Sequence, residues 1–294
     1  MKKILIIGAS GLLGNKLYQL ASSEYQVYGT FNTHMPELKN IYQLDVTKRE
    51  DVFKIIENIR PDYVIDTHAL HNVDYCELHP EEAWLVNVEG TKNVAEACKI
   101  FGCKYVFIST DYVFDGKKVT PYTEKDKPNP LNYYAKTKLI AEEVIKILTS
   151  DYIIARTAVL FGVGGLGKEP FALWLIKKLR NGEEVKAVID QYNNPTLVDS
   201  LAEILLTLCE KDKVGLFHIS GRTNLNRYEF SVKIAEKFGL NKELIKPITT
   251  PELNQIAPRP RKVALDTSKV ERATKIKTLD IDEALEIFKS QVSL

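Results

Sequence analysis

A glycine-rich turn at the start of the chain constrains its fold more than any other feature of the sequence. Residues 3–7 are an apolar run that predicts a buried strand, and residues 12–22 have the pattern of a helix. The turn between them has the spacing G-x-x-G-x-x-G. Glycine lets the backbone approach a pyrophosphate closely, and the free N–H groups at the start of a helix favour its negative charge. We therefore predict a dinucleotide site with contacts along the turn, at Gly8, Ser10, Gly11, Leu12, Leu13 and Gly14.

Short apolar strands alternate with helices through the first half of the chain. Further strands are predicted at 27–30, 63–65, 104–108 and 152–155, and helices at 48–58, 81–100 and 133–148. Such alternation indicates a parallel sheet covered on both faces, which is a doubly wound, Rossmann-type α/β fold. We predict a dinucleotide-binding domain at 1–155 and a smaller C-terminal substrate-binding lobe at 156–294. No linker separates them, so we expect them to be interleaved, with part of 187–215 in the first domain. Beyond residue 156 the pattern is less regular, and helices are predicted at 168–181, 197–210, 227–238 and 281–290.

Composition excludes several classes of protein. The 294 residues carry a formal net charge of +1, without the basic excess that nucleic-acid binding requires. No apolar run approaches the ~18 residues of a membrane span, and the apolar start is too short for a signal peptide, so we predict a cytoplasmic protein. The four cysteines fit no zinc spacing, and His68 and His71 have no third ligand nearby, so no metal is expected.

The segment after the second predicted strand bears on the choice of cofactor. An NAD-selective site usually has an acidic residue about 20 residues beyond the turn, but residues 27–34 contain none. A carboxylate there would repel the 2′-phosphate of NADP, whereas Thr30 and Asn32 would not. We therefore expect NADP(H) in preference to NAD(H). Further on, Asp45, next to Val46, could accept a hydrogen bond from the adenine amino group or could cap the following helix.

The catalytic candidates are a tyrosine and a lysine at the start of a predicted helix. Tyr134 and Lys138 form the pattern Y-x-x-x-K, which puts both side chains on one helix face. We expect the lysine charge to lower the pKa of the phenol from about 10, so that the phenol can protonate an alkoxide as hydride arrives. The pattern alone is common on exposed helices. Here it follows a long loop, 110–132, after a strand that ends near Thr110, whose hydroxyl could orient a carbonyl.

These motifs resemble those of the extended short-chain dehydrogenase/reductase superfamily and, within it, of the dTDP-4-dehydrorhamnose reductase family. The resemblance covers nearly the whole chain. Its most specific stretches are STDYVFDG at 109–116, PYTE at 121–124, YAKTK at 134–138, VNVEGT at 86–91, DQ at 190–191, PT at 195–196 and RP at 259–260. The resemblance implies Thr110, Tyr134 and Lys138 as the catalytic triad. It also implies cofactor contacts from Ala69 and Tyr134, and from Lys138 to the nicotinamide ribose.

The resemblance further implies an activity. This activity is NADPH-dependent reduction of the C4 ketone of a nucleotide-activated deoxysugar, as in dTDP-rhamnose biosynthesis. The implied substrate contacts are Asp111, Val113, Phe114 and Arg259. Arg259 or Arg261 could clamp the diphosphate, since a guanidinium matches phosphate oxygens, or both could lie in a solvated turn. A nucleotide sugar is the expected partner, a homodimer is open, and no nucleic acid or membrane partner is expected.

Two departures from the family pattern concern the sugar. Val159 stands where these reductases usually have tryptophan, and Lys262-Val263 stands where they usually have Asn-Ser. Both lie in the predicted substrate lobe and leave the cofactor assignment intact. The second half of the chain is also similar to the regulatory β-subunit of methionine adenosyltransferase. That relative keeps the fold and cofactor site but acts by binding a catalytic subunit, so a non-catalytic, NADP-binding regulatory role is the alternative prediction.

Overall fold

A seven-stranded parallel sheet forms the centre of the protein. A computed structural model describes residues 1–167 and 169–292. The strand order is β11-β6-β5-β4-β1-β2-β3, and every neighbouring pair is parallel. The strands are β1 (Lys3–Ile7), β2 (Gln26–Phe31), β3 (Ile41–Gln43), β4 (Tyr63–Asp66), β5 (Lys104–Thr110), β6 (Tyr152–Thr157) and β11 (Gly215–His218). The doubly wound Rossmann fold expected from the sequence is therefore confirmed.

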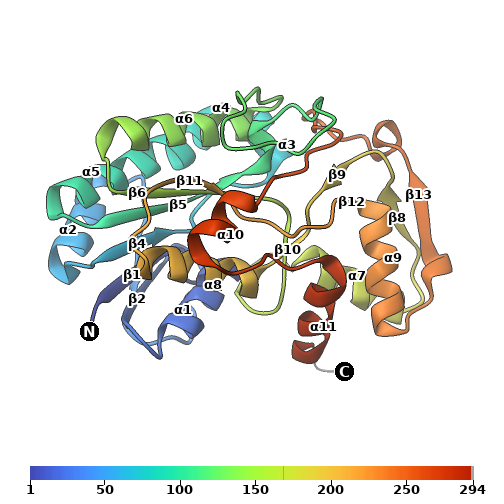
Figure 1. The fold of residues 1–294 in the computed structure, drawn as a ribbon, viewed down its shortest axis with the longest axis horizontal. Coiled ribbons are helices and arrows are strands. Elements are labelled where there is room, and N and C mark those ends of the chain that lie inside the picture. The colour runs from blue at the N-terminus through green and yellow to red at the C-terminus, as the bar shows by residue number, and fades with distance from the viewer. Residues whose placement is uncertain (168, 293–294) are drawn as a thin grey trace.

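Helices cover both faces of this sheet (Figure 1). One face packs against α1 (Leu12–Ala21), α8 (Val198–Glu210) and α10 (Ser268–Thr274). The other packs against α2 (Arg49–Ile59), α5 (Thr91–Phe101) and α6 (Tyr133–Leu148). Strands buried on both faces must be apolar, which is why residues 4–7 are a continuous apolar run and all four are buried.

The strand order reverses beside β1, and this reversal positions the site. From β1 the chain goes outward to β2 and β3, then crosses back to β4 on the other side of β1. Ile7 at the end of β1 pairs with Asp66 at the end of β4. Ligands of open α/β sheets bind at such a switch point, outside the carboxyl ends of the strands.

A second hydrophobic core lies in the C-terminal part of the chain. It joins α7 (Phe171–Arg180), α9 (Arg227–Phe238) and α11 (Ile281–Gln291) with the parallel pair β8 (Val185–Val188) and β13 (Ile245–Ile248). Two short pairs connect this part to the sheet, namely β7 (Leu160–Phe161) with β10 (Thr196–Leu197), and β9 (Tyr192–Asn193) with β12 (Leu225–Asn226). The chain returns to the sheet at α8 and β11, so residues beyond 155 complete the first core. Domain boundaries at 1–155 and 156–294 stay a prediction.

The structure differs from the predicted elements at several places. The helix predicted over 81–100 consists of α4 (Pro80–Trp84), the π-helix η1 (Leu85–Gly90) and α5. The short strand β3, and α3 (Val73–Leu78), were not predicted. The helix predicted from residue 168 begins at Phe171, and residue 168 itself lies outside the described residues. No helix in the described part of the chain is long and apolar enough to cross a membrane.

Candidate active site

The glycine turn has the geometry of a phosphate cradle. Gly8 has φ +83°, which glycine adopts without strain, and Gly11 N–H donates to Gly8 O at 2.9 Å. A Cβ on Gly14 would lie 2.2 Å from Gly8 O, so only glycine lets α1 pack this closely on the turn. The N-cap of α1 is Gly11, which offers no capping side chain. The first N–H groups of the helix are therefore left for an anion, and the turn fits a dinucleotide.

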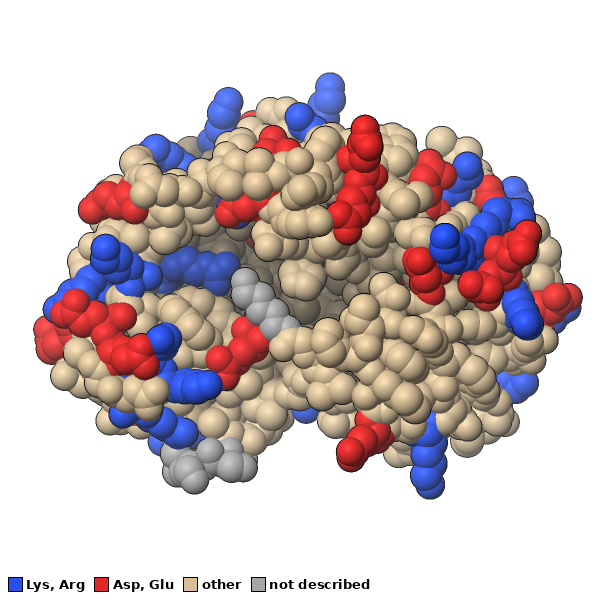
Figure 2. Space-filling view, turned by 180° about the vertical axis from the view of Figure 1, so that it is seen from behind, with Lys and Arg blue, Asp and Glu red and all other residues tan. Residues whose placement is uncertain are grey.

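A second glycine-rich loop covers this turn, and sequence reasoning missed it. Leu166 N–H donates to Ser10 O at 2.6 Å, and a Cβ on Gly165 would lie 2.7 Å from Leu12 N. The loop borders a hollow of about 230 Å³, lined also by Leu173. Seen from behind, the surface is hollowed near the middle of the molecule (Figure 2). The signal in the sequence was the run GVGGLG at 162–167, directly after β7.

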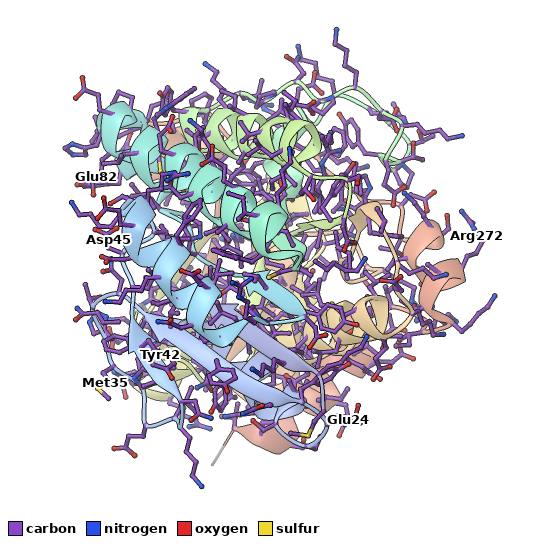
Figure 3. All side chains as sticks on the ribbon, turned by 90° about the vertical axis from the view of Figure 1, so that its left-hand side faces the viewer. Glu24, Met35, Tyr42, Asp45, Glu82 and Arg272 are labelled. Carbon is purple, nitrogen blue, oxygen red and sulfur yellow. The ribbon has the colours of Figure 1, made fainter. Side chains whose placement is uncertain are left out.

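The predicted adenosine contacts surround the carboxyl end of β2. Thr30 is buried and its hydroxyl accepts from Gly8 N–H at 3.3 Å, whereas Asn32 is exposed. Asp45 accepts from the N–H and the hydroxyl of Thr47, so it forms a local turn and is not the N-cap, which is Lys48. Figure 3 shows Asp45 near the start of α2. Of the two remaining candidates, Val46 is buried and Ala69 is partly buried after β4.

Thr110 and Tyr134 are brought together by the start of α6. Thr110 ends β5, and its hydroxyl accepts from Tyr112 N–H and donates to Asp111 Oδ1, each at 3.2 Å. The side chain of Asn132 caps α6 by accepting from Ala135 N–H. Burial raises the pKa of Tyr134 well above 10, and the nearby Thr110 hydroxyl offsets only part of that. The expected lowering of this pKa by the lysine is therefore wrong, because desolvation dominates.

Lys138 lies in a buried pocket of opposite charge. Its Nζ sits 3.8 Å from the centre of the Phe107 ring, and the side chain is only 2% exposed. Burial lowers the pKa of Lys138 from 10.5 to about 8, although Asp66 and Glu142 raise it in part. Asp66 is bound by the Tyr105 hydroxyl at 2.6 Å. The amine therefore keeps most of its charge at neutral pH.

His68 and Asn87 fix the loop after β4. His68 Nδ1 lies 2.5 Å from Asp66 Oδ1 and its Nε2 lies 3.1 Å from Val86 O. Burial opposes ionisation of Asp66, but His68 and Tyr105 together hold the pKa of this carboxyl below its usual value. Asn87, in η1, accepts from Leu70 N–H at 2.8 Å and donates to Leu70 O. These bonds hold the segment that contains Ala69. This role was not predicted: His68 was considered only as a metal ligand, and Asn87 only as part of the stretch 86–91.

The predicted substrate contacts divide into two groups. Asp111 is 3% exposed, and its Oδ2 has no hydrogen-bond partner among the described residues. Burial raises the pKa of Asp111 to about 7. Val113 and Phe114 are fully buried with Tyr122 and Val263. Their side chains stabilise the loop after β5, and the role of the two residues as substrate contacts stays a prediction.

Arg259 is already occupied by an acidic partner. Its Nη1 contacts Asp74 Oδ1 in α3 and Ala257 O, each at 2.5 Å. Asp74 also accepts from the N–H groups of Ile256 and Ala257. Arg261, the other candidate clamp, is exposed. The arginine that was expected to hold a diphosphate therefore ties the segment 256–259 to the first part of the molecule.

The assembled side chains could hold a dinucleotide at the switch point and present a hydroxyl, a phenol and an amine beside it. A sequence profile described as the RmlD substrate binding domain matches residues 1–293. The chain belongs to this family. Its members among the relatives include a dTDP-4-dehydrorhamnose reductase of Aggregatibacter actinomycetemcomitans, which is 32% identical over 97% of each chain.

Two further relatives widen the comparison. The crystal structure of the dTDP-4-dehydrorhamnose reductase from Bacillus anthracis in complex with NADP superposes with a TM-score of 0.90. It is 30% identical and covers 99% of this chain and 100% of its own. The methionine adenosyltransferase 2 subunit beta of Bos taurus is 32% identical over 92% of this chain and 82% of its own. The relatives of this chain thus include reductases and a subunit of another enzyme.

Proposed function

We propose that this chain is a reductase that transfers hydride from NADPH to the C4 ketone of a nucleotide-activated deoxysugar, as in dTDP-rhamnose biosynthesis. The observation that carries the proposal is that Thr110 ends β5 and that Tyr134 and Lys138 lie at the start of α6, at the same edge of the parallel sheet as the glycine turn. The reductases in the same family support the substrate class. The proposal includes a cytoplasmic location and leaves a homodimer to be measured.

Thr110 and Tyr134 would each have one task in this reaction, and Lys138 would have two. Bound NADPH would supply the hydride. The Thr110 hydroxyl, which now donates to Asp111, would donate to the ketone oxygen and polarise the carbonyl. The raised pKa keeps the Tyr134 phenol protonated at neutral pH, so it can deliver a proton to the oxygen as the alkoxide forms. Lys138 would bind the nicotinamide ribose and stabilise the phenolate that remains.

The preference for NADPH rests on the segment after β2. Asn32 is exposed at the end of this strand and no carboxylate is present there to repel a 2′-phosphate. The relative from Bacillus anthracis binds NADP. Titration with both cofactors tests the preference, and we expect NADPH to bind several-fold more tightly. Equal affinities, or tighter binding of NADH, would contradict it.

The activity itself is tested with a panel of nucleotide-activated 4-ketosugars. We expect consumption of NADPH, followed by its absorbance, with at least one deoxysugar substrate and none with the matching 4-hydroxy sugar. A Val159→Trp variant measured on the same panel tests whether this position touches the sugar. Val159 is partly buried just before β7, so an unchanged profile of kcat/KM would remove it from the site.

A regulatory role is the second candidate, supported by the 32% identity to methionine adenosyltransferase 2 subunit beta. The glycine turn would then bind the cofactor without turnover. Capture of partners from native extract, followed by an assay for S-adenosylmethionine formation, separates the two roles. Activation of a catalytic subunit by a protein that reduces no ketosugar would favour the regulatory role.

A further inference from the structure

Among the buried polar atoms that have no hydrogen-bond partner in the described residues, two belong to groups of opposite charge from different parts of the chain. One is Oδ2 of Asp111, directly after Thr110. The other is Nη1 of Arg227, the first residue of α9. Buried polar atoms in native proteins are nearly always hydrogen-bonded. This pair therefore indicates a polar ligand that enters between them.

The start of α9 holds Arg227 firmly in this position. Asn226 and Glu229 form a capping box that fixes the first turn of the helix. The guanidinium lies over the Phe171 ring, 5.2 Å from its centre. Burial lowers the pKa of Arg227, while Tyr112 and Asp111 raise it in part, which indicates that both lie close by. A desolvated, oriented cation of this kind is suited to binding an anion.

The other two arginines near the site each already bind a carboxylate, although Nη1 of Arg156 also has no partner in the described residues. Arg156 binds Glu142 through two nitrogens, at 2.9 and 2.6 Å. Arg259 binds Asp74. Arg227 and Arg259 both lie near Tyr112. Burial raises the pKa of the Tyr112 phenol, and the two guanidiniums lower it in part. Of these three arginines, Arg227 alone forms no ion pair with a carboxylate in the described residues, and its buried Nη1 has no partner there.

We propose that Arg227 binds the diphosphate of the nucleotide sugar, while Asp111 accepts a hydrogen bond from a hydroxyl of the sugar next to Thr110. This inference rests on the proposed function, which supplies a substrate with both groups. A guanidinium forms paired, charge-assisted hydrogen bonds with phosphate oxygens. Arg227 begins α9 of the C-terminal core and Asp111 directly follows β5 of the sheet, so the substrate would bridge the two parts of the molecule.

Binding of thymidine diphosphate, measured by calorimetry against thymidine, tests the proposal without requiring turnover. Arg227→Gln should weaken thymidine diphosphate about 10- to 100-fold and leave the affinities for thymidine and NADPH unchanged. Arg227→Lys keeps the charge but loses the planar fork, so it should fall between. Arg272→Gln removes the same charge from α10, where Figure 3 shows the side chain pointing outward, and should change nothing.

The outcomes separate the inference from the proposed function. Wild-type affinity for thymidine diphosphate in Arg227→Gln, or no binding by the wild-type protein, would overturn the inference. An equal loss for thymidine and NADPH would also overturn it, because that pattern indicates a structural role. If Arg227→Gln does not fold, the same comparison is made with Arg227→Lys. A wild-type protein that binds thymidine diphosphate through Arg227 but reduces no ketosugar would refute the reductase and leave the inference standing.

Discussion

Burial shifts the pKa values of two residues in the candidate active site, Tyr134 and Lys138, in opposite directions. Burial raises the pKa of the phenol and lowers that of the amine to about 8. At neutral pH the phenol is therefore a proton donor, and the amine is still charged with help from Asp66 and Glu142. Reduction needs this combination, because the alkoxide takes up a proton as hydride arrives.

Removing the proton donor should stop the chemistry and little else. Tyr134→Phe should lower kcat by roughly 10²- to 10⁴-fold, the usual worth of a positioned proton donor, with unchanged NADPH affinity. Tyr133→Phe is the matched control, because its side chain lies about 100° around α6 from Tyr134. Steady-state kinetics on both variants provides the measurement. Equal losses in the two would show that Tyr134 has no special role.

Removing the buried charge should stabilise the protein. The difference between pKa 10.5 and about 8 corresponds to roughly 3 kcal/mol of folding free energy lost at pH 7. Lys138→Met should regain up to about that much in denaturant unfolding. The unfolded chain holds the proton between pH 8 and 10.5 and the folded protein does not. Wild-type stability therefore rises with pH in this window and the advantage of Lys138→Met shrinks.

Lys136→Met is the control for this stability measurement. Lys136 is exposed on the same helix, so its substitution should change the unfolding free energy little at any pH. A Lys138→Met variant that is less stable than wild type at pH 7 would show that the charge of Lys138 stabilises the fold.

At the scale of elements, the contact between the glycine turn and the start of α1 decides whether the cofactor site can form. The turn has no room for a Cβ at Gly14, where a substituent would lie 2.2 Å from Gly8 O. A Cβ on Gly11 would lie 3.3 Å from its nearest neighbour, which is also Gly8 O. The two glycines of the same turn therefore have different reasons to be there.

This difference predicts unequal effects of one added methyl group. Gly14→Ala should destabilise the protein by about 1–3 kcal/mol, as overpacking does, and weaken NADPH binding because α1 must move. Gly11 has φ −76°, which alanine adopts freely. Gly11→Ala should therefore lower the unfolding free energy by less than about 1 kcal/mol. Thermal unfolding and NADPH titration of both variants give the answer. Equal destabilisation would mean that the turn relaxes around the methyl at Gly14.

Several elements could be predicted from local sequence, and others could not. The bounds of α6 and α9 were predicted as observed, because capping asparagines and, for α9, a following Gly239 mark the ends in the sequence itself. The π-helix η1 has no such mark. It lies where Asn87 must reach both Leu70 and Thr137, and these partners are brought to it only by the fold. A helical pattern cannot reveal that requirement.

The same limit applies to the candidate site. The residue types of the turn and of the Y-x-x-x-K pattern are local and were predicted. The partner of Arg259 is 185 residues away, and the pKa of Tyr134 depends on burial, so neither could be read from spacing. Arg227 was seen only as the start of a helix, because the missing hydrogen-bond partner of its Nη1 is a property of the folded chain.

At the scale of the whole molecule, the contact between Asp74 and Arg259 joins the C-terminal segment to α3. Arg259 is 9% exposed and Asp74 34%, so the pair is partly screened by solvent. The hydrogen bond from Arg259 is the largest cause that holds the pKa of Asp74 below 3.8. A carboxyl with a depressed pKa stabilises the fold above its ordinary pKa and loses this effect as the pH falls through the native one.

Asp74→Asn should therefore lower stability at neutral pH and not in acid. We expect a loss of about 1–2 kcal/mol at pH 7, less than for a fully buried pair, shrinking as the pH falls below 3.8. Urea unfolding across this range measures it, with hydrogen exchange at 256–259 as a local readout. Asp282→Asn is the control, because the Asp282 side chain, which pairs with Lys233, is 73% exposed. A pH-independent difference would point to packing instead of charge.

The return of α8 and β11 to the central sheet has a consequence for how the protein is made. A ribosome that has completed β6 has delivered six of the seven sheet strands, but the apolar face over α1 still lacks Leu205, Leu208 and Phe217. About 60 more residues separate β6 from the end of β11, so at 5–20 residues per second this face stays bare for roughly 3–12 s. During that interval the exposed apolar face makes the nascent chain a substrate for a chaperone. A fragment that ends at residue 155 would expose this face permanently.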